Sequence, residues 1–383
     1  MTVKATFLPS RLPGIDVLRA FAASAVVVAH VVKWPWGYAG SAGWMGHLWR
    51  FADSGMGNWG VGLFFILSGL CIHLPVARSL AENKPPTLDL KRYLRKRARR
   101  IYPPHAVAIL LSWLVAAWIS LPPAFSAYLS VPTAGQLLAH AFMVHTFVPG
   151  AYYSISNVLW TIALEAHFYL LYPFLLRCRR RVEMRTLCAI LFGIMVALRL
   201  LDHALPISWR GVLTYNFLGR WWEWILGAAL AEWLTASPRK QVSPGLVWAT
   251  AALSALAACA VSRISHGILI CAIAGPFVYA FVVALAVRME TRDESVVDGI
   301  LVAIGLRSYS LYLVHPIALT LVAAALWGRV SSPALEIVAS VSASYLAMAI
   351  YFSLVEKRFV DIRPAPLRSP SSQLSMPMSP DGL

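Results

Sequence analysis

The stretch IDVLRAFAASAVVVAHVVKW, residues 15–34, decides the fold class. It is a run of about 20 mostly apolar residues, the length that an α-helix needs to cross the hydrocarbon core of a bilayer. Nine further runs of the same character follow it, at 57–77, 102–121, 158–176, 186–204, 214–235, 245–263, 267–287, 301–327 and 334–356. The sequence therefore predicts an all-α, polytopic integral membrane protein with about ten transmembrane helices.

The composition of the 383-residue chain supports this class. Hydrophobic residues make up 59%, charged residues only 13%, and the mean hydropathy is +0.66. Soluble domains are about 45–50% apolar and about 25% charged. The chain has too little polar surface for a soluble enzyme and is too apolar to stay disordered. Its five cysteines are odd in number and show no CxxC or metal-ligand spacing, so we expect neither a disulfide framework nor a metal site.

The formal net charge of +16 is unevenly distributed along the chain. If the N-terminus is cytoplasmic, the inner segments hold 24 Lys and Arg residues and the outer segments hold six. Cytoplasmic loops of membrane proteins carry such an excess of Lys and Arg. We therefore expect both termini in the cytoplasm, and we interpret most of the charge as a topology signal rather than a nucleic-acid-binding surface.

Two segments lie outside this pattern of spans. Residues 134–148 are apolar but too short to cross a bilayer, which predicts an interfacial or re-entrant helix. Residues 362–383 are rich in Pro and Ser and are expected to form a disordered cytoplasmic tail. The predicted organisation is thus one transmembrane domain over residues 1–361, followed by this tail.

A strongly basic segment directly precedes the third span. Residues 91–100, KRYLRKRARR, hold seven basic residues. Stop-transfer charge with anionic-lipid contact explains most of them. The alternative is a docking site for a polyanionic cytoplasmic ligand, for which Arg97 and Arg100 are the best candidates, because an i, i+3 pair shares one helical face.

The first span contains ionisable residues that a bilayer disfavours. Asp16 and Arg19 are i, i+3 neighbours that can pair, and His30 lies eleven residues beyond Arg19. Eleven steps return to nearly the same helical face, displaced by about 16 Å. A long ligand could lie along this stripe with its anionic end at Arg19 and its reactive end at His30. The alternative is a helix-end anchor plus a satisfied buried histidine.

Glu165 in the fourth span is expected at a depth similar to that of His30. A carboxylate beside a histidine fixes its tautomer and raises its basicity, as a general base requires. An unrelated interhelical hydrogen bond is the alternative. Further polar positions that could line a pocket or only support helix packing are Ser68, Ser308, Tyr309, Tyr312, His315 and the pair Arg220 and Glu223. Aromatic-belt anchoring is the competing interpretation for the last pair, which lies among three tryptophans.

Six motifs in order make the chain resemble the membrane-bound acyltransferase family 3, the O-acetyltransferases of bacterial glycans. They run from about residue 11 to residue 358. The motifs are IDVLRAFAASAVVVAH with R-x10-H, GVGLFFILSG, RKRARRIYP with R-x-x-R, LWTIALEAHFYLLYP with Trp160, Glu165 and Tyr169, RWWEWILGAALA, and SYSLYLVHP. Gly62 stands where members often have a polar residue, so it receives no role. The extracellular hydrolase-like domain of larger members is not expected in this chain.

The resemblance implies a bacterial inner-membrane O-acyltransferase. Its donor would be cytoplasmic acetyl-CoA or another acyl-CoA, held through its phosphates by Arg19, Arg97 and Arg100. Its acceptor would be a hydroxyl of a carbohydrate such as a cell-surface polysaccharide or a lipid-linked glycan. His30, oriented by Glu165, would deprotonate this hydroxyl, and an acetyl-histidine intermediate is the open alternative.

Two other classes compete with the enzyme. A transporter or flippase also places charges inside the membrane, although no inverted repeat is evident in the sequence. A non-enzymatic scaffold leaves the intramembrane His, Glu and Arg residues unexplained. We expect the bilayer, the acyl-CoA and the glycan as partners and no nucleic acid, and a homo-oligomer is an open alternative to a monomer.

Overall fold

The computed structural model describes residues 12–33, 44–85, 87–119, 128–206, 209, 211–236, 241–264, 267–289, 296–326, 329–330 and 332–360. Over these residues the chain is all-helical apart from turns and two isolated β-bridges. The elements are α1 (Pro13–Lys33), α2 (Trp44–Ala81), α3 (Leu90–Trp118), α4 (Ala134–Ala141), η3 (His145–Phe147), α5 (Leu159–Arg179), α6 (Met184–Ala204), α7 (Phe217–Ala236), α8 (Pro244–Val261), α9 (Gly267–Val287), α10 (Val296–Leu306), α11 (Ser308–Leu326), α12 (Pro333–Leu354) and η5 (Glu356–Arg358).

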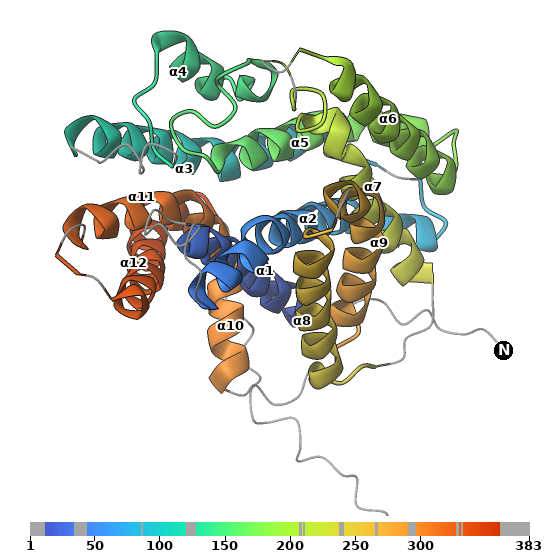
Figure 1. The fold of residues 1–383 in the computed structure, drawn as a ribbon. Helices are drawn as coiled ribbons and strands as arrows, with labels where there is room; N and C mark the ends of the chain where they lie inside the picture. Colours follow the sequence, from blue (N-terminus) through green and yellow to red (C-terminus); the bar gives the residue numbers. More distant parts are fainter. Residues whose placement is uncertain are drawn as a thin grey trace, which may run out of the picture.

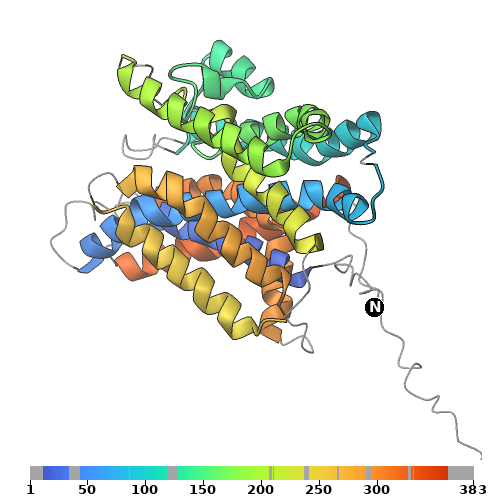
Figure 2. The same cartoon turned by 90° about the vertical axis from the view of Figure 1, so that its right-hand side faces the viewer.

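The helices form two layers. Figures 1 and 2 show α3, α5 and α6 in one layer, with the short α4 at its outer face, and α1, α2, α8 and α9 in the other. Helix α7 runs between the layers and packs most extensively on α2. Nine helices in the described residues are long and apolar enough to cross a membrane. The predicted class of a polytopic all-α membrane protein is confirmed.

Glycines bring the α2 and α7 backbones into contact. A Cβ on Gly69 would lie 1.9 Å from the carbonyl oxygen of Trp224, and a Cβ on Gly227 would lie 2.0 Å from that of Ile66. Only glycine fits at such a distance, and small residues are typical of tightly packed membrane helices. Gly69, in the motif GVGLFFILSG of the second predicted span, therefore serves close packing of α2 against α7.

One predicted span is wrong as a single element. The run 301–327 breaks at Arg307 into α10 and α11. The free first-turn amide of α11 at Ser310 donates to Glu356, whose carboxylate also accepts the Ser310 hydroxyl. A carboxylate stabilises a helix N-terminus, which explains why a new helix can begin here inside the apolar run.

Other predicted boundaries shift without changing the class. The basic segment is already helical, because α3 begins at Leu90 and the Asp89 side chain caps it by accepting from the Arg92 amide at 3.0 Å. The sixth predicted span is α7, which contains three charged residues and is not among the nine helices of the described residues that are long and apolar enough to cross a membrane. The short segment 134–148 contains the eight-residue α4 followed by η3. The predicted tail lies outside the described residues.

Candidate active site

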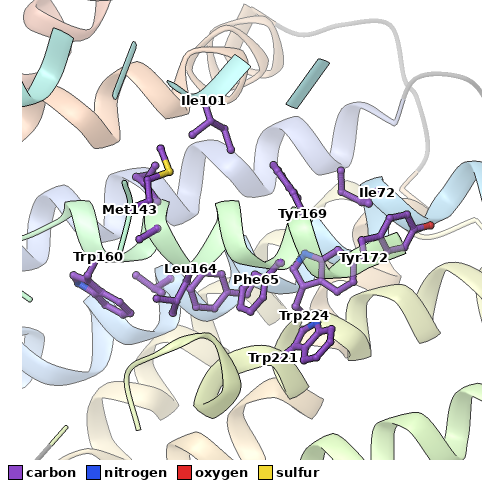
Figure 3. Close-up of a cluster of buried hydrophobic side chains, with 14 of the residues drawn as sticks. Phe65, Ile72, Ile101, Met143, Trp160, Leu164, Tyr169, Tyr172, Trp221 and Trp224 are labelled. Carbon is purple, nitrogen blue, oxygen red and sulfur yellow. The ribbon is translucent and has the colours of Figure 1, made fainter. Parts of the chain in front are cut away.

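A cavity of about 170 Å³ lies between the two layers. Its walls come from α1, α2, α3, α5 and α11, so it collects side chains that are far apart in the sequence. Nine of the predicted site residues line it: Arg19, Ser68, Arg97, Arg100, Glu165, Tyr169, Ser308, Tyr309 and Tyr312. The cluster of buried hydrophobic side chains in Figure 3 forms part of its walls, and Phe65, Ile72, Ile101 and Tyr169 belong to both.

The basic segment turns two of its arginines into this cavity. Arg97 and Arg100 are half-buried and line the wall, whereas Arg95, Lys96 and Arg99 are exposed. The Arg97 guanidinium lies 5.7 Å from the ring centre of Tyr93 and 5.5 Å from that of Tyr169. Neither Arg97 nor Arg100 forms an ion pair with a described carboxylate, so both can bind an anionic group.

Arg19 reaches the same cavity from α1. Its Nη1 donates to Asp16 at 3.1 Å, and its Nη2 lies 3.3 Å from the sulfur of Cys71. The predicted Asp16–Arg19 pair is therefore formed, and Asp16 acts as a positioning residue. Three guanidinium groups and one carboxylate, Glu165, give this wall an excess of positive charge.

The hydrogen-bond partners of Glu165 are residues of the cavity wall and not His30. Its carboxylate accepts hydrogen bonds from the hydroxyls of Tyr169 and Ser68, the latter at 3.2 Å. Both Glu165 and His30 are among the described residues, and no hydrogen bond joins them. The structure thus places Glu165 with Ser68 and Tyr169, and the expected orientation of His30 by Glu165 is not observed.

The α1 backbone orients His30 instead. Its Nδ1 lies 2.8 Å from the carbonyl oxygen of Val26. A carbonyl can only accept, so Nδ1 carries a proton, and in the neutral ring Nε2 then carries the lone pair that a general base requires. The ring lies beside two aromatic residues, 5.1 Å from His315 and 5.7 Å from Tyr128 between centroids.

Tyr312 connects the histidines to the cavity. It lines the cavity wall, and its ring centre lies 5.9 Å from that of His315. Its hydroxyl accepts a 2.8 Å hydrogen bond from Thr161. His30 and His315 do not line the cavity; His315 is in ring contact with Tyr312, and His30 is in ring contact with His315. The predicted stripe on α1 therefore meets the cavity at Arg19, and at its other end His30 is paired with His315.

Three predicted residues lie elsewhere. Trp160 stacks on Tyr152 with the ring centroids 5.4 Å apart and does not line the cavity. Arg220 and Glu223 form a buried ion pair, Nε to Oε1 at 2.8 Å, that lines a second and smaller cavity. Aromatic-belt anchoring alone does not explain this pair, because both side chains are buried.

The structure adds residues that the sequence analysis missed. Cys71, Phe65 and Thr161 line the cavity, and Glu356 caps the helix that carries Ser308, Tyr309 and Tyr312. Glu356 is fully buried. In the sequence it stands beside Lys357 and Arg358 after the last predicted span, where it looks like an ordinary surface charge, so the pattern does not predict its capping role. Tyr309 is fixed by a 2.9 Å hydrogen bond from its hydroxyl to the carbonyl oxygen of Ile101.

Comparison with known proteins identifies the family. Residues 12–353 match the acyltransferase 3 family, described as an acyltransferase domain. The chain belongs to this family. Because the match covers nearly the whole chain, the cavity and the histidine pair are features of an acyltransferase fold, and the resemblance suggested by the six motifs is confirmed.

Curated relatives of this acyltransferase are distant. Nodulation protein 10 of Rhizobium leguminosarum bv. viciae is 30% identical over 176 residues, which cover 43% of this chain and 44% of the relative. O-acetyltransferase OatA of Staphylococcus aureus (strain NCTC 8325 / PS 47) is 28% identical over 181 residues, which cover 44% of this chain and 25% of the relative. The chain thus matches less than half of each relative. No solved structure matches it.

Proposed function

We propose that this acyltransferase is an O-acetyltransferase of the bacterial cytoplasmic membrane that moves an acetyl group from cytoplasmic acetyl-CoA to a hydroxyl of a carbohydrate. The observation that carries the proposal is the cavity in which Arg19, Arg97 and Arg100 meet, adjacent to a histidine pair. The inward bias of Lys and Arg supports a cytoplasmic origin of the donor. The name of the relative OatA supports acetyl transfer to oxygen.

The three arginines match the chemistry of the donor. Acyl-CoA carries several phosphate groups at one end and a thioester at the end of a long, uncharged arm. Charge-assisted hydrogen bonds from guanidinium to phosphate are among the strongest in proteins. The donor phosphates would bind Arg97 and Arg100 at the edge of the cavity, with Arg19 further in. The thioester would then approach Tyr312 and the histidines.

His30 would act as the general base. Its Nε2 takes the proton of the acceptor hydroxyl while the oxygen attacks the thioester carbon. The carbon–sulfur bond breaks, the acetyl group stays on the oxygen, and the CoA thiolate takes the proton back from His30. Glu165, held by Tyr169 and Ser68, would position the arm of the donor rather than His30.

Purified protein in lipid nanodiscs tests the proposal. Acetyl-CoA carrying a labelled acetyl group is supplied together with glycans extracted from cells that lack the protein. We expect label to enter a base-labile ester on the glycan, in parallel with release of free CoA thiol. Label that stays on acetyl-CoA, or that enters only amides, would overturn the assignment. A comparison of glycan masses from cells with and without the protein identifies the acceptor.

A further inference from the structure

The second cavity, of about 40 Å³, lies between α2, α6, α7 and α9. A water molecule needs roughly 10–15 Å³ of such space, so the cavity has room for about three waters or one acidic group. Its polar lining residues are Asn58, Arg199, Tyr215, Arg220, Glu223 and Tyr279. Asn58 is exposed and marks the side from which the cavity can be reached.

The lining carries more positive than negative charge. Arg220 pairs with Glu223, with Nη2 to Oε2 at 2.9 Å, and both are buried. Arg199 has no carboxylate partner among the described residues, and its Nε lies 3.2 Å from the sulfur of Met195. The nearby carboxylate of Asp202 accepts from backbone amides of the loop before α7 instead, at 2.8 Å from Gly211. Arg199 is half-buried, so its guanidinium can form charge-assisted hydrogen bonds with an anionic ligand in the cavity.

A single aromatic ring separates this cavity from the donor cavity. Phe65 lines the larger cavity, and the Arg220 guanidinium lies 5.3 Å from the centre of the same ring. Figure 3 shows Phe65 in the row of buried side chains that runs from Trp160 to Tyr172. A ligand bound at Arg220 would therefore lie one ring away from the donor.

The second cavity also lies at the depth of His30. A Cβ on Gly57 would contact the Cβ of Ala29 at 3.5 Å, so the α2 segment next to Asn58 runs beside the α1 segment next to His30. Asn58 lines the second cavity. The second cavity thus has a lining residue on the α2 segment that neighbours the His30 end of α1.

We propose that the second cavity binds the acidic group of the sugar acceptor, a carboxylate or a phosphate, through Arg199 and Arg220. This inference rests on the proposed O-acetyltransferase function. It adds that the acceptor is an acidic sugar, which membership of the family does not imply. The acid anchors one end of the acceptor while its hydroxyl reaches the reacting groups past Phe65.

Direct binding tests the anion site independently of catalysis. Tryptophan fluorescence of the purified full chain in nanodiscs is titrated with methyl glucuronoside, with the uncharged methyl glucoside, and with glucose 6-phosphate. Trp222 donates to the carbonyl of Ala272, a residue of the cavity wall, and therefore reports on occupancy. We expect the acidic sugars to bind at least tenfold more tightly than the glucoside, and the better of the two identifies carboxylate or phosphate as the natural group.

The variant Arg199→Gln should remove this difference, and Arg199→Lys should retain part of it. The matched control is Arg329→Gln, which removes an exposed arginine elsewhere. Equal affinities of the wild-type protein for glucuronoside and glucoside would overturn the proposal, as would an unchanged preference in Arg199→Gln. Binding of acetyl-CoA, measured on the same samples, should be equal in all of them. If no sample bound acetyl-CoA, the donor assignment would be contradicted. The anion site would still be decided separately, by the affinities measured for the acidic and uncharged sugars.

Discussion

The imidazole rings of His30 on α1 and His315 on α11 lie 5.1 Å apart between centroids. Each ring is oriented by the carbonyl four residues earlier in its own helix, His30 through Val26 and His315 through Leu311 at 3.1 Å. Both Nδ1 atoms therefore carry a proton, and both Nε2 atoms can accept one. The site thus contains two imidazoles side by side, each of which presents Nε2 as a proton acceptor when the ring is neutral.

The first prediction separates the two histidines. His30→Gln should lower kcat by roughly 10²–10⁴-fold, the usual contribution of a general base, without changing the KM for acetyl-CoA. His315→Gln should lower kcat by less, because His315 is fully buried and supports the ring of His30, whereas His30 is partly exposed and can meet a substrate. Steady-state kinetics on nanodisc samples with equal thermal stability provides the measurement. Equal losses in both variants would show that the pair acts as one unit.

The second prediction concerns the donor arginines. Arg97→Gln with Arg100→Gln should raise the KM for acetyl-CoA by roughly 10–100-fold, since a hydrogen bond to a charged group contributes about 1.5–3 kcal/mol. The matched control is Arg95→Gln with Lys96→Gln, which removes two exposed charges from the same helix. The control tests whether total charge, rather than position, determines donor binding.

A truncated donor sharpens this experiment. S-acetyl-N-acetylcysteamine keeps the thioester but lacks the phosphates, so its KM should be the same in the wild type and in the Arg97/Arg100 variant. A matching rise in KM for the truncated donor would mean that the two arginines support the fold of the cavity instead of binding phosphate.

Sequence patterns could predict the arginines that line the larger cavity, because their placement depends on local helix geometry. Arg97 and Arg100 share a helical face by spacing alone, and Asp16 and Arg19 pair within one turn. The partner of Glu165 could not be predicted in this way. Its contact with Ser68 depends on the packing of α2 against α5, and depth in the bilayer specifies a level but not an angle around the helix.

The break at Arg307 could not be predicted for a similar reason. Hydropathy treats residues 301–327 as continuous, and the element that ends one helix and begins the next is Glu356, nearly fifty residues later in the chain. The two-layer arrangement likewise depends on close contacts such as that between Gly69 and Trp224, which no single-span pattern contains.

The third prediction follows from the observed partners of Glu165. Glu165→Gln should lower kcat/KM while the pH midpoint of activity, which reports the base, stays the same. A carboxylate in contact with His30 would stabilise the charged imidazole, and its removal would move the midpoint to lower pH. A pH–rate profile distinguishes the two cases. Tyr169→Phe, which removes one hydrogen bond to Glu165, should give a smaller loss with the same midpoint.

The fourth prediction concerns the contact between α2 and α7. Gly69→Ala and Gly227→Ala should each destabilise the protein by about 1–3 kcal/mol or more, because the new Cβ meets backbone that cannot move aside. Gly193→Ala in α6 is the matched control, since nothing lies within 4 Å of its Cβ position. Thermal unfolding in detergent provides the measurement, and equal midpoints in all three variants would contradict the close packing of the two helices.

The last prediction uses the stacked rings of His140 and His145, whose centroids lie 3.7 Å apart in α4 and η3. Burial, together with repulsion from neighbouring histidines, lowers the pKa of His140 to about 4 and that of His145 to about 2. Both rings are therefore neutral in the folded protein, whereas an unfolded histidine titrates near 6.5. Below pH 6.5 only the unfolded state gains these protons, so this part of the protein loses stability as the pH falls.

The loss should approach about 1.4 kcal/mol per pH unit for each histidine between pH 6 and the lowered pKa. Hydrogen exchange of residues 134–147, followed by mass spectrometry at pH 7 and pH 5, provides the measurement. We expect faster local opening at pH 5 after correction for intrinsic exchange rates. In the variant His145→Phe, which keeps a stacked ring without a titrating group, the acceleration should be smaller, and an equal acceleration would assign the pH dependence to other groups.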